Sequence, residues 1–495
     1  YDAGIRLLHV GINSACPLPS VPTFCRWRSP SGNDLLLVYQ KDYGEDEVLP
    51  DGKTVVSINF TGDNHGPHSY ERVKKIYADL RKRYPQAQLV GASFNDVARE
   101  LLLIKKDLPV VTSEIGDTWI FGYGGAPIRM AKFRAVSRLY SQWLNEGKIK
   151  KDSDVALDFA AELGLIAEHT QGVDVKTHLR QWDKYDMDKF LKGRSEGVFS
   201  MAEASWKEID NYIDSAIAFL PASLQKEARE VVAEVDKVKL EDNSKMKPMA
   251  RKRWEQPIAG GMTLAGLSYQ MFDGDDYDDF QNRYLRARYE WALDDLGKRG
   301  LKESHAVSVT LYAQTMAQSV RKEKKGTRII TELRFPENEK VDKRVYPERI
   351  QVNCFTTKNG KRSEVALTVY GKPAVRLPES YWLSFTVPGI ESVIAEKMGE
   401  RVDLMDVVEK GNRQMHGIDR YVDLITSGET IRISSKEAFL LNVGEAQGLN
   451  YSTNYPDKHK GVHFNLNNNL WGTNFSMWNE GSLTYHFVIE TLNHK

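Results

Sequence analysis

The stretch Thr54-Val55-Val56-Ser57-Ile58-Asn59-Phe60 is followed by Gly62-Asp63-Asn64-His65-Gly66-Pro67-His68. The first part is β-branched and apolar, which is typical of a buried strand. Ser69 then begins a predicted helix, with apolar residues at positions 73, 76, 77 and 80. A carboxylate between a strand and a helix lies at the position where α/β folds usually carry their catalytic residues. The stretch therefore predicts an α/β fold with Asp63 as a candidate catalytic residue. A polar loop made of turn residues is the alternative interpretation.

The rest of the N-terminal region repeats this alternation. Strands are predicted at 5–12, 35–39, 54–60, 88–92 and 109–112, and helices at 70–84 and 94–105. Ser93 begins the second helix with Asp96 three residues later, which is a capping-box pattern. Alternating strands and helices imply a mainly parallel sheet.

Two further regions follow. Helical periodicity dominates from 127 to 300, at 129–144, 155–169, 206–220 and 223–239. From about 303 the pattern becomes β, with strands predicted at 305–313, 327–333, 349–355, 364–370, 381–387, 430–434, 462–466 and 484–490. We therefore predict an α/β domain at 1–126, a helical bundle at 127–300 and a β-sandwich-like region at 301–495.

Composition narrows the functional class. The chain has 68 basic and 68 acidic residues, so its net charge is zero, which argues against a general nucleic-acid binder. No apolar run approaches the roughly 18 residues of a membrane span. We therefore predict no membrane-spanning segment. The three cysteines form neither a disulfide framework nor a CxxC motif. We favour a secreted or periplasmic location over a cytoplasmic one, and we leave open whether the partners include further copies of the chain.

Several polar and aromatic residues are candidates for binding. In the first loop, Asn64, His65 and His68 are predicted to contact substrate, and the histidines could also bind a metal. The segment 114–125 adds the carboxylates of Glu114 and Asp117 and the rings of Trp119 and Tyr123, among four glycines. Glycines allow a backbone to approach a ligand closely, and rings beside carboxylates are how proteins hold sugars. A structural glycine-rich loop is the alternative.

The run from Gly461 to Trp478 is rich in asparagine. Asparagine is uncommon in strand interiors, so the run predicts a loop that caps turns or binds polyol hydroxyls. Trp471 and Asn474 are its candidate binding residues. In the segment Ala167-Glu168-His169-Thr170-Gln171-Gly172, His169 shares a predicted helix face with Leu165 and Ile166. That face is expected to be buried, so a core histidine is the plain interpretation of His169.

Taken in order, these segments resemble the α-mannosidases of glycoside hydrolase family 38, and more closely a family of related proteins of unassigned function. The resemblance rests on the segments 24–35, 62–67, 114–123 and 167–172 and on their order along the chain. It implies part of a (β/α)7-type barrel, then a helical bundle, then a β-rich region. It also implies that Asp63 is the acid/base carboxylate and that His169 is a zinc ligand.

The implied chemistry is retaining hydrolysis of a carbohydrate substrate, in which Asp63 protonates the leaving oxygen and then deprotonates water. Zinc would bind sugar hydroxyls, and Trp119, Tyr123 and Trp471 would be stacking rings. The His-x-Asp pair and the nucleophile of the mannosidases are not found, so we expect them to precede Tyr1. A non-catalytic sugar-binding protein and a zinc-dependent carbohydrate deacetylase are the alternatives.

Overall fold

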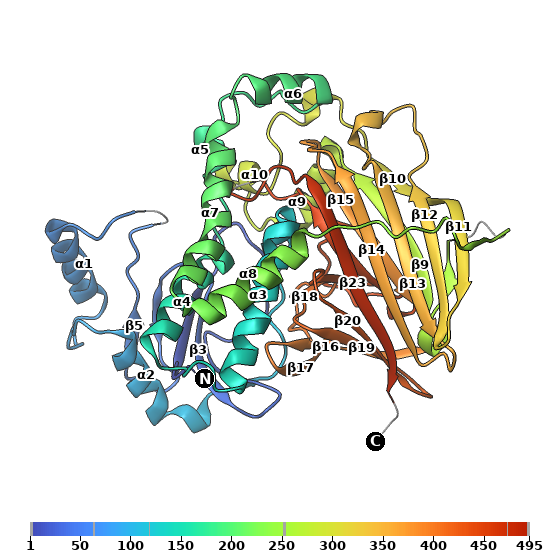
Figure 1. Cartoon of the computed structure of the whole chain (residues 1–495). Helices are drawn as coiled ribbons and strands as arrows, with labels where there is room; N and C mark the ends of the chain where they lie inside the picture. Colours follow the sequence, from blue (N-terminus) through green and yellow to red (C-terminus); the bar gives the residue numbers. More distant parts are fainter. Residues whose placement is uncertain (1–2, 63–64, 118, 251–253, 473, 493–495) are drawn as a thin grey trace. The chain divides into compact units, whose positions relative to one another are not determined.

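The computed structural model of the chain describes residues 3–62, 65–117, 119–250, 254–472 and 474–492 (Figure 1). The chain divides into two units, each of which is described by itself. Unit 1 comprises Tyr1–Ile115, Tyr284–Arg288 and Asp406–Gly411. Unit 2 comprises Gly116–Arg283, Tyr289–Met405 and Asn412–Lys495.

Unit 1 contains a four-stranded mixed sheet with the strand order β1, β3, β2, β6. The strands are β1 (Leu7–Gly11), β2 (Phe24–Arg28), β3 (Asp34–Gln40) and β6 (Val110–Val111). The pairs β1–β3 and β2–β6 are parallel, whereas β2 and β3 are antiparallel. Strands predicted near 5–12, 35–39 and 109–112 are confirmed. Two of the three pairings are parallel, in line with the prediction, and the third is antiparallel because β2, which was not predicted, forms a hairpin with β3.

Two predicted strands of unit 1 differ in the structure. The segment 54–60 gives only β5 (Val55–Ser57), which pairs with β4 (Asp46–Val48) in a separate two-stranded sheet. Only Val56 of β5 is buried, and Phe60 is 54% exposed. This strand is therefore not part of the core sheet. No strand forms at 88–92 in the described part of unit 1.

The two helices predicted in unit 1 are confirmed. They are α1 (Tyr70–Arg83) and α2 (Phe94–Leu103). The hydroxyl of Ser69 accepts the backbone N–H of Arg72 at 3.2 Å, which caps α1. The carboxylate of Asp96 accepts the backbone N–H of Ser93 at 2.7 Å, as the capping-box pattern predicts.

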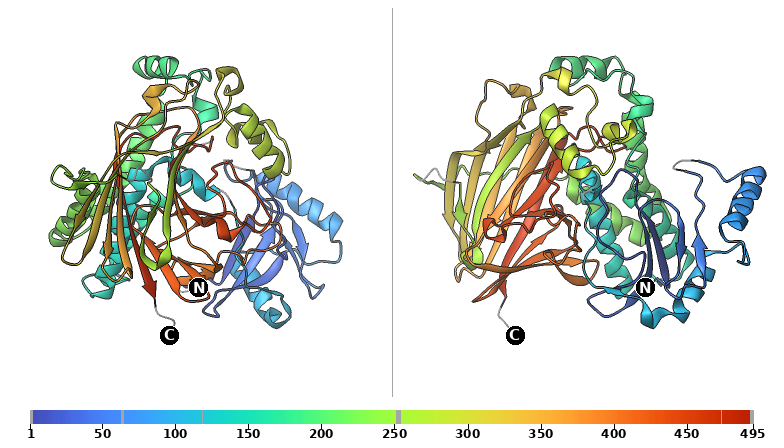
Figure 2. Two further views of the ribbon diagram at one scale, coloured as in Figure 1. Left: turned by 90° about the vertical axis from the view of Figure 1, so that its right-hand side faces the viewer. Right: turned by 180° about the vertical axis from the view of Figure 1, so that it is seen from behind.

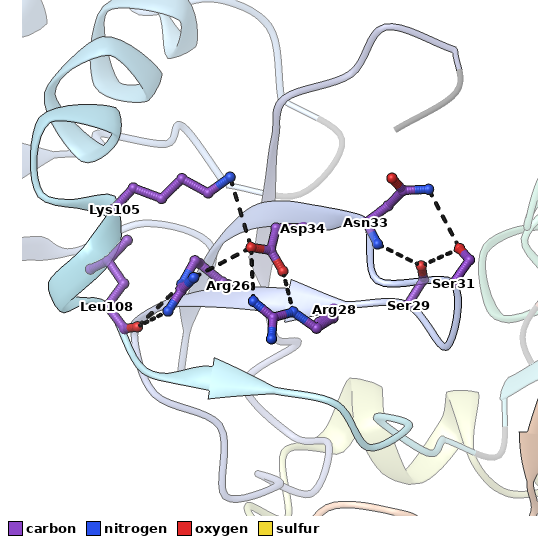
Figure 3. Close-up of polar contacts among 8 residues, drawn as sticks. All are labelled: Arg26, Arg28, Ser29, Ser31, Asn33, Asp34, Lys105 and Leu108. Carbon is purple, nitrogen blue, oxygen red and sulfur yellow. Dashed lines mark hydrogen bonds and ion pairs between the residues drawn. The ribbon is translucent and has the colours of Figure 1, made fainter.

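Asp34 lies at the start of β3 and joins three cations (Figure 3). Its carboxylate lies 2.7 Å from Nε of Arg28, 3.4 Å from Nη1 of Arg26 and 3.8 Å from Nζ of Lys105. The hydrogen bond from Arg28 is the main reason that the pKa of Asp34 is lowered. Arg26 also donates to the carbonyl of Leu108. These contacts connect β2 and β3 to the segment after α2, so they serve the fold of unit 1.

Unit 2 begins with a helical region (Figure 1). Its helices are α3 (Pro127–Asn145), α4 (Asp154–Gly164), α5 (Val175–His178), α6 (Met187–Ser195), α7 (Ser200–Ala218) and α8 (Ala222–Asp236). Trp143 of α3, Phe159 of α4 and Ile213 of α7 belong to one buried cluster, which explains why these helices form a bundle. Two later helices are α9 (Gly274–Tyr284) and α10 (Glu290–Asp295). Within the described residues, no helix is both long enough and apolar enough to cross a membrane.

The rest of unit 2 is dominated by two antiparallel sheets. The larger has the order β17, β16, β19, β20, β23, β14, β13, β12, β11, β7. Its strands are β7 (Lys247–Pro248), β11 (Gln314–Lys322), β12 (Gly326–Arg334), β13 (Arg349–Thr357), β14 (Arg362–Lys372), β16 (Ile390–Lys397), β17 (Glu400–Asp403), β19 (Tyr421–Thr426), β20 (Thr430–Ser435) and β23 (Gly481–Leu492). Figure 2 shows this sheet from two further sides.

The smaller sheet has the order β10, β9, β15, β22, β21, β18, with β8 paired to β9. Its strands are β8 (Gln256–Pro257), β9 (Thr263–Met271), β10 (Val309–Tyr312), β15 (Glu379–Thr386), β18 (Met415–Gly417), β21 (Leu440–Val443) and β22 (Val462–Asn468). Phe385 and Phe464 of this sheet pack on Phe487 of the larger sheet, with ring centroids 5.4 and 5.0 Å apart. The two sheets therefore share one core, and the predicted β-rich C-terminal region is confirmed.

His463 in β22 gives the β region a pH dependence that can be measured. The ring is 7% exposed. Nε2 lies 3.1 Å from the carbonyl of Gly444, and Nδ1 lies 2.8 Å from the hydroxyl of Ser384. Because the carbonyl only accepts, Nε2 carries the proton and Nδ1 accepts from Ser384. Burial lowers the pKa of His463 to about 4.

We expect the neutral His463 to make unit 2 sensitive to acid. The unfolded chain protonates this residue below its usual pKa of about 6.5, whereas the folded chain does so only near pH 4. The contribution is therefore fully present above pH 6.5 and is lost as the pH falls to about 4, at a cost of about 3 kcal/mol. Urea unfolding across this range should show a weaker pH dependence for His463→Gln than for the exposed control His459→Gln. Equal dependence would contradict the assignment.

Candidate functional site

Four aromatic rings gather in unit 2, three of them predicted from the sequence. The ring centroid of Trp119 lies 5.2 Å from that of Trp471 and 6.2 Å from that of Phe475. Phe475 also meets Tyr123 at 5.9 Å. Trp119 and Tyr123 are half-buried, whereas Trp471 and Phe475 are 6% and 2% exposed. We call these four residues the ring cluster. Trp119 and Tyr123 are its members with partly accessible rings.

The glycines of the segment 114–125 allow the ring cluster to form. Trp119–Gly125 is a 3-10 helix. A Cβ on Gly122 would lie 2.4 Å from the ring of Phe475, and one on Gly124 would lie 2.2 Å from Nδ2 of Asn468. The sequence predicted close approach of this backbone to a ligand. In the structure, the groups that approach these two glycines closely are side chains of the chain itself.

Tyr123 connects the ring cluster to the segment that contains His169. Its hydroxyl donates to the carbonyl of Ala167 at 2.8 Å and lies 3.1 Å from that of Glu168. Burial, together with the charge of Glu168, raises the pKa of Tyr123 to about 12. Tyr123 is therefore a neutral hydrogen-bond donor at ordinary pH.

A buried polar network fixes the same segment from the other side. Arg129 of α3 donates to the side-chain oxygen of Gln171 at 3.0 Å and to the carbonyl of Trp206 at 2.8 Å. The amide of Gln171 donates to the carbonyls of Ile166 and Glu168 at 2.9 and 2.8 Å. The turn before His169 is thus held in place by α3. No local pattern in the sequence indicates a role for Arg129, because its partners are distant along the chain.

His169 lies at the surface of unit 2, which corrects the buried face predicted for it. Its side chain is 75% exposed. The helix predicted to reach 169 ends at Gly164, so the helical spacing from Leu165 and Ile166 no longer applies. Nδ1 of His169 lies 2.5 Å from the carboxylate of Glu168. Burial raises the pKa of Glu168, but hydrogen bonds from His169 and Thr170 outweigh it, so the pKa is lowered.

The surroundings of His169 suit it to be one ligand of a metal ion. A carboxylate on one ring nitrogen orients the other toward a metal in zinc sites, and Glu168 holds Nδ1 in this way. Across the described residues, no three His, Cys, Asp or Glu side chains are grouped so that they could hold a metal ion. We therefore derive no chemical step through zinc, and the zinc site stays a prediction.

The remaining predicted residues of the first loop belong to unit 1. Asp63 and Asn64 lie outside the described residues. His65 is exposed, and Nε2 of His68 lies 2.9 Å from the carbonyl of Asn59. Glu114 is half-buried in unit 1, where its backbone N–H donates to the carbonyl of Asp406 at 2.9 Å.

Asp117 is exposed and belongs to unit 2. Asn474 also lies in unit 2, beside Phe475 of the ring cluster. Its amide oxygen is buried and accepts no hydrogen bond from the described residues. An unpaired buried amide oxygen can accept a hydrogen bond from a hydroxyl group of a ligand. Asn474 therefore stays a candidate for substrate binding.

The asparagine-rich run from Gly461 to Trp478 was predicted to be a loop, but part of it is a buried strand. Residues 465, 467 and 468 lie in the buried strand β22 rather than in a loop. The amide of Asn469 donates to the carbonyls of Val375, Leu377 and Met477 at 2.9 to 3.0 Å. These bonds fix the chain directly before Trp471, so the run positions the ring cluster.

Comparisons with known proteins agree with this architecture. A family model described as a domain of unknown function (DUF5054) matches residues 124–258. No curated protein matches the sequence. An α-mannosidase from Enterococcus faecalis V583 is similar in structure, with a TM-score of 0.50 and 9% identity over 99% of this chain and 70% of that chain. A protein in glycosyl hydrolase family 38 from Enterococcus faecalis has a TM-score of 0.42 and 10% identity over 95% of this chain and 69% of that chain. The likeness to the first of these structures confirms the predicted resemblance to α-mannosidases at the level of the fold.

Proposed function

We propose that this protein is a glycoside hydrolase that acts on α-mannosidic or similar linkages. The observation that carries the proposal is the likeness in fold to an α-mannosidase across 99% of the chain. The ring cluster supports it, because Trp119 and Tyr123 combine partly accessible rings with a fixed backbone. Aromatic faces beside polar groups suit sugar rings, which are apolar on one face and carry hydroxyls at their edges.

We propose retaining hydrolysis with Asp63 as the acid/base residue. In this chemistry a protonated carboxyl donates its proton to the leaving glycosidic oxygen, and the resulting carboxylate then deprotonates the attacking water. A second carboxyl about 5–5.5 Å away acts as the nucleophile. His169 would be one ligand of a zinc ion, and a bound zinc ion would supply contacts to sugar hydroxyls.

The test is a panel of aryl glycosides assayed with the full-length protein, including any residues that precede Tyr1, and with its Asp63→Asn variant. We expect release from the α-mannoside with retained configuration, a fall of about 10²–10⁴-fold in kcat for Asp63→Asn, and loss of activity on chelation that zinc restores. The control is Asp51→Asn, which removes an exposed carboxylate of unit 1. Unchanged kcat in Asp63→Asn would contradict the role of Asp63. Saturable sugar binding without release would favour a non-catalytic binding protein, and acetate release would favour a deacetylase.

A further inference from the structure

The smaller sheet of unit 2 has a groove on the face that points away from the core. Leu383 and Phe385 of β15 are core residues, so Ser384 between them points to the opposite face. Ser384 lines the groove, together with residues of β9, β10 and β22 and the loop 444–447. The volume of the groove is about 460 Å³, which lies within the usual range of ligand pockets. The groove is therefore large enough for a small organic ligand.

The register of the strands explains why this face is hollow. Gly266 of β9 lies opposite Ser384, which lies opposite His463 of β22. In the neighbouring row, Tyr312 of β10 lies opposite Ser268. The middle of the face therefore carries only small side chains, and a Cβ on Gly266 would meet nothing within 4 Å. Tyr312, which is 68% exposed, borders the hollow.

Buried polar side chains hold the loop 444–447 at the rim of the groove. Gln270 of β9, which is 6% exposed, donates to the carbonyl of Ala446 at 2.6 Å. Asn442 of β21, which is fully buried, donates to the carbonyls of residues 445 and 447 at 3.1 and 2.9 Å. Because these contacts fix the loop in advance, a ligand that binds here does not have to order it. The groove is thus a preformed site.

The charges along the groove disfavour an anionic ligand. Its lining includes two carboxylates, Asp276 and Glu445, and one ammonium group, Lys460. Glu445 lies 2.7 Å from Nζ of Lys460, and Asp276 accepts a backbone N–H at 3.0 Å. His463 is neutral at ordinary pH, because burial lowers its pKa to about 4. The groove therefore has no excess of positive charge that would attract a phosphate or a carboxylate.

Uncommitted hydrogen-bonding groups in the groove suit a ligand rich in hydroxyls. Thr310 and Tyr312 are exposed and Gln447 is half-buried, and their side chains make no hydrogen bond to another described residue. The hydroxyl of Ser384 donates to Nδ1 of His463 at 2.8 Å, so its oxygen can still accept a hydrogen bond. Donors and acceptors of this kind, beside an exposed ring, match a sugar, which has hydroxyls at its edges and an apolar face.

We infer that this groove binds a neutral carbohydrate, with the face of one sugar ring against Tyr312. Hydroxyls of the sugar donate to Ser384 and Gln447 and accept from Thr310. The residues of the ring cluster, all of them described, do not line the groove. The groove is therefore a second place for carbohydrate on unit 2, and binding there does not depend on the proposed hydrolase activity.

Crystals of the full chain soaked with mannotriose, cellotriose or chitotriose give the first test. We expect density for at least one of these neutral sugars in the groove, with a ring stacked on Tyr312. Sugar density at Trp119 and none in the groove would assign carbohydrate binding to the ring cluster and overturn the inference. Absence of all three sugars from the groove at saturating concentration would overturn it as well.

Calorimetric titration with the same three sugars gives a second test in solution. Tyr312→Ala is expected to weaken binding about tenfold, because it removes the stacking ring. Gly266→Phe is expected to abolish binding, because the new ring fills the hollow without a clash at its Cβ. The first matched control is Tyr455→Ala, which removes a 70% exposed ring outside the groove. The second is Gly428→Phe, whose Cβ also meets nothing within 4 Å. Both controls should bind as the wild type does.

The acidic trisaccharide trigalacturonate tests the class of ligand. It is not expected to bind, because the carboxylates outnumber the ammonium group along the groove. Binding of trigalacturonate as tight as that of the neutral sugars would contradict the inference. If Gly266→Phe does not fold, Tyr312→Ala decides, because its side chain is exposed. Unchanged affinity in Tyr312→Ala would contradict the groove as the site.

Discussion

Lys372→Met is expected to lower the free energy of unfolding by about 3–5 kcal/mol, because it leaves a buried carboxylate without its cation. Lys372 and Glu379 have side chains that are 4% and 0% exposed, and Nζ lies 2.5 Å from Oε1. Lys372 also donates to the carbonyl of Asn479 at 2.9 Å, and Tyr269 donates to Oε2 of Glu379 at 2.9 Å. Oε1 of Glu379 is buried with no hydrogen bond from the described residues, so the carboxylate depends on the charge of Lys372.

The effect should extend to the ring cluster. Burial already raises the pKa of Glu379, and the charge of Lys372 opposes this rise. Without Lys372, the pKa of Glu379 is expected to rise further. The backbone N–H of Glu379 donates to the side-chain oxygen of Asn469 at 2.7 Å, so a shift of β15 moves the segment that leads to Trp471.

Denaturant unfolding with a constant m-value is the measurement. The matched control is Lys361→Met, because Lys361 is exposed directly before β14 and should change stability by less than about 0.5 kcal/mol. The double variant Lys372→Met/Glu379→Met removes both charges and should recover part of the loss. A loss in the double variant as large as in the single one would show that packing, rather than the stranded charge, sets the cost.

Local signals in the sequence predicted the elements whose stabilising contacts are also local. Ser69 and Ser93 cap helices through residues three positions away. The strand pattern after 303 was similarly readable, since its alternation reflects one buried face. The sequence analysis missed β2 because this short segment becomes a strand only by pairing with β3 and β6.

The site was less predictable because long-range contacts decide it. The rings of Trp119 and Trp471 could be proposed from residue type, but Phe475 joins them only through the fold. His169 was expected to be buried because the helix was extended past Gly164. The exposure of its side chain follows from a turn that Arg129 and Gln171 fix from α3, and no local pattern encodes that contact.

Gly124→Ala is expected to lower the free energy of unfolding by about 3 kcal/mol and to disturb the ring cluster. The new Cβ would lie 2.2 Å from Nδ2 of Asn468 and 3.0 Å from Oδ1 of Asn465. Neither atom can move away from the new Cβ without losing hydrogen bonds. Nδ2 of Asn468 donates to the carbonyl of Phe121 and to Oδ1 of Asn465, both at 2.9 Å, inside a buried strand.

The matched control for this variant is Gly164→Ala. A Cβ on Gly164 meets nothing within 4 Å, and its φ of −61° suits any residue. Alanine there should be neutral or stabilising by up to about 1 kcal/mol. Chemical denaturation and tryptophan fluorescence together separate the outcomes. A stable Gly124→Ala protein with unchanged emission would show that the segment 119–125 tolerates displacement. Lost stability with altered emission would show that the contact between Gly124 and Asn468 sets the position of Trp119 beside Trp471, and that the asparagine run serves the site by holding this backbone.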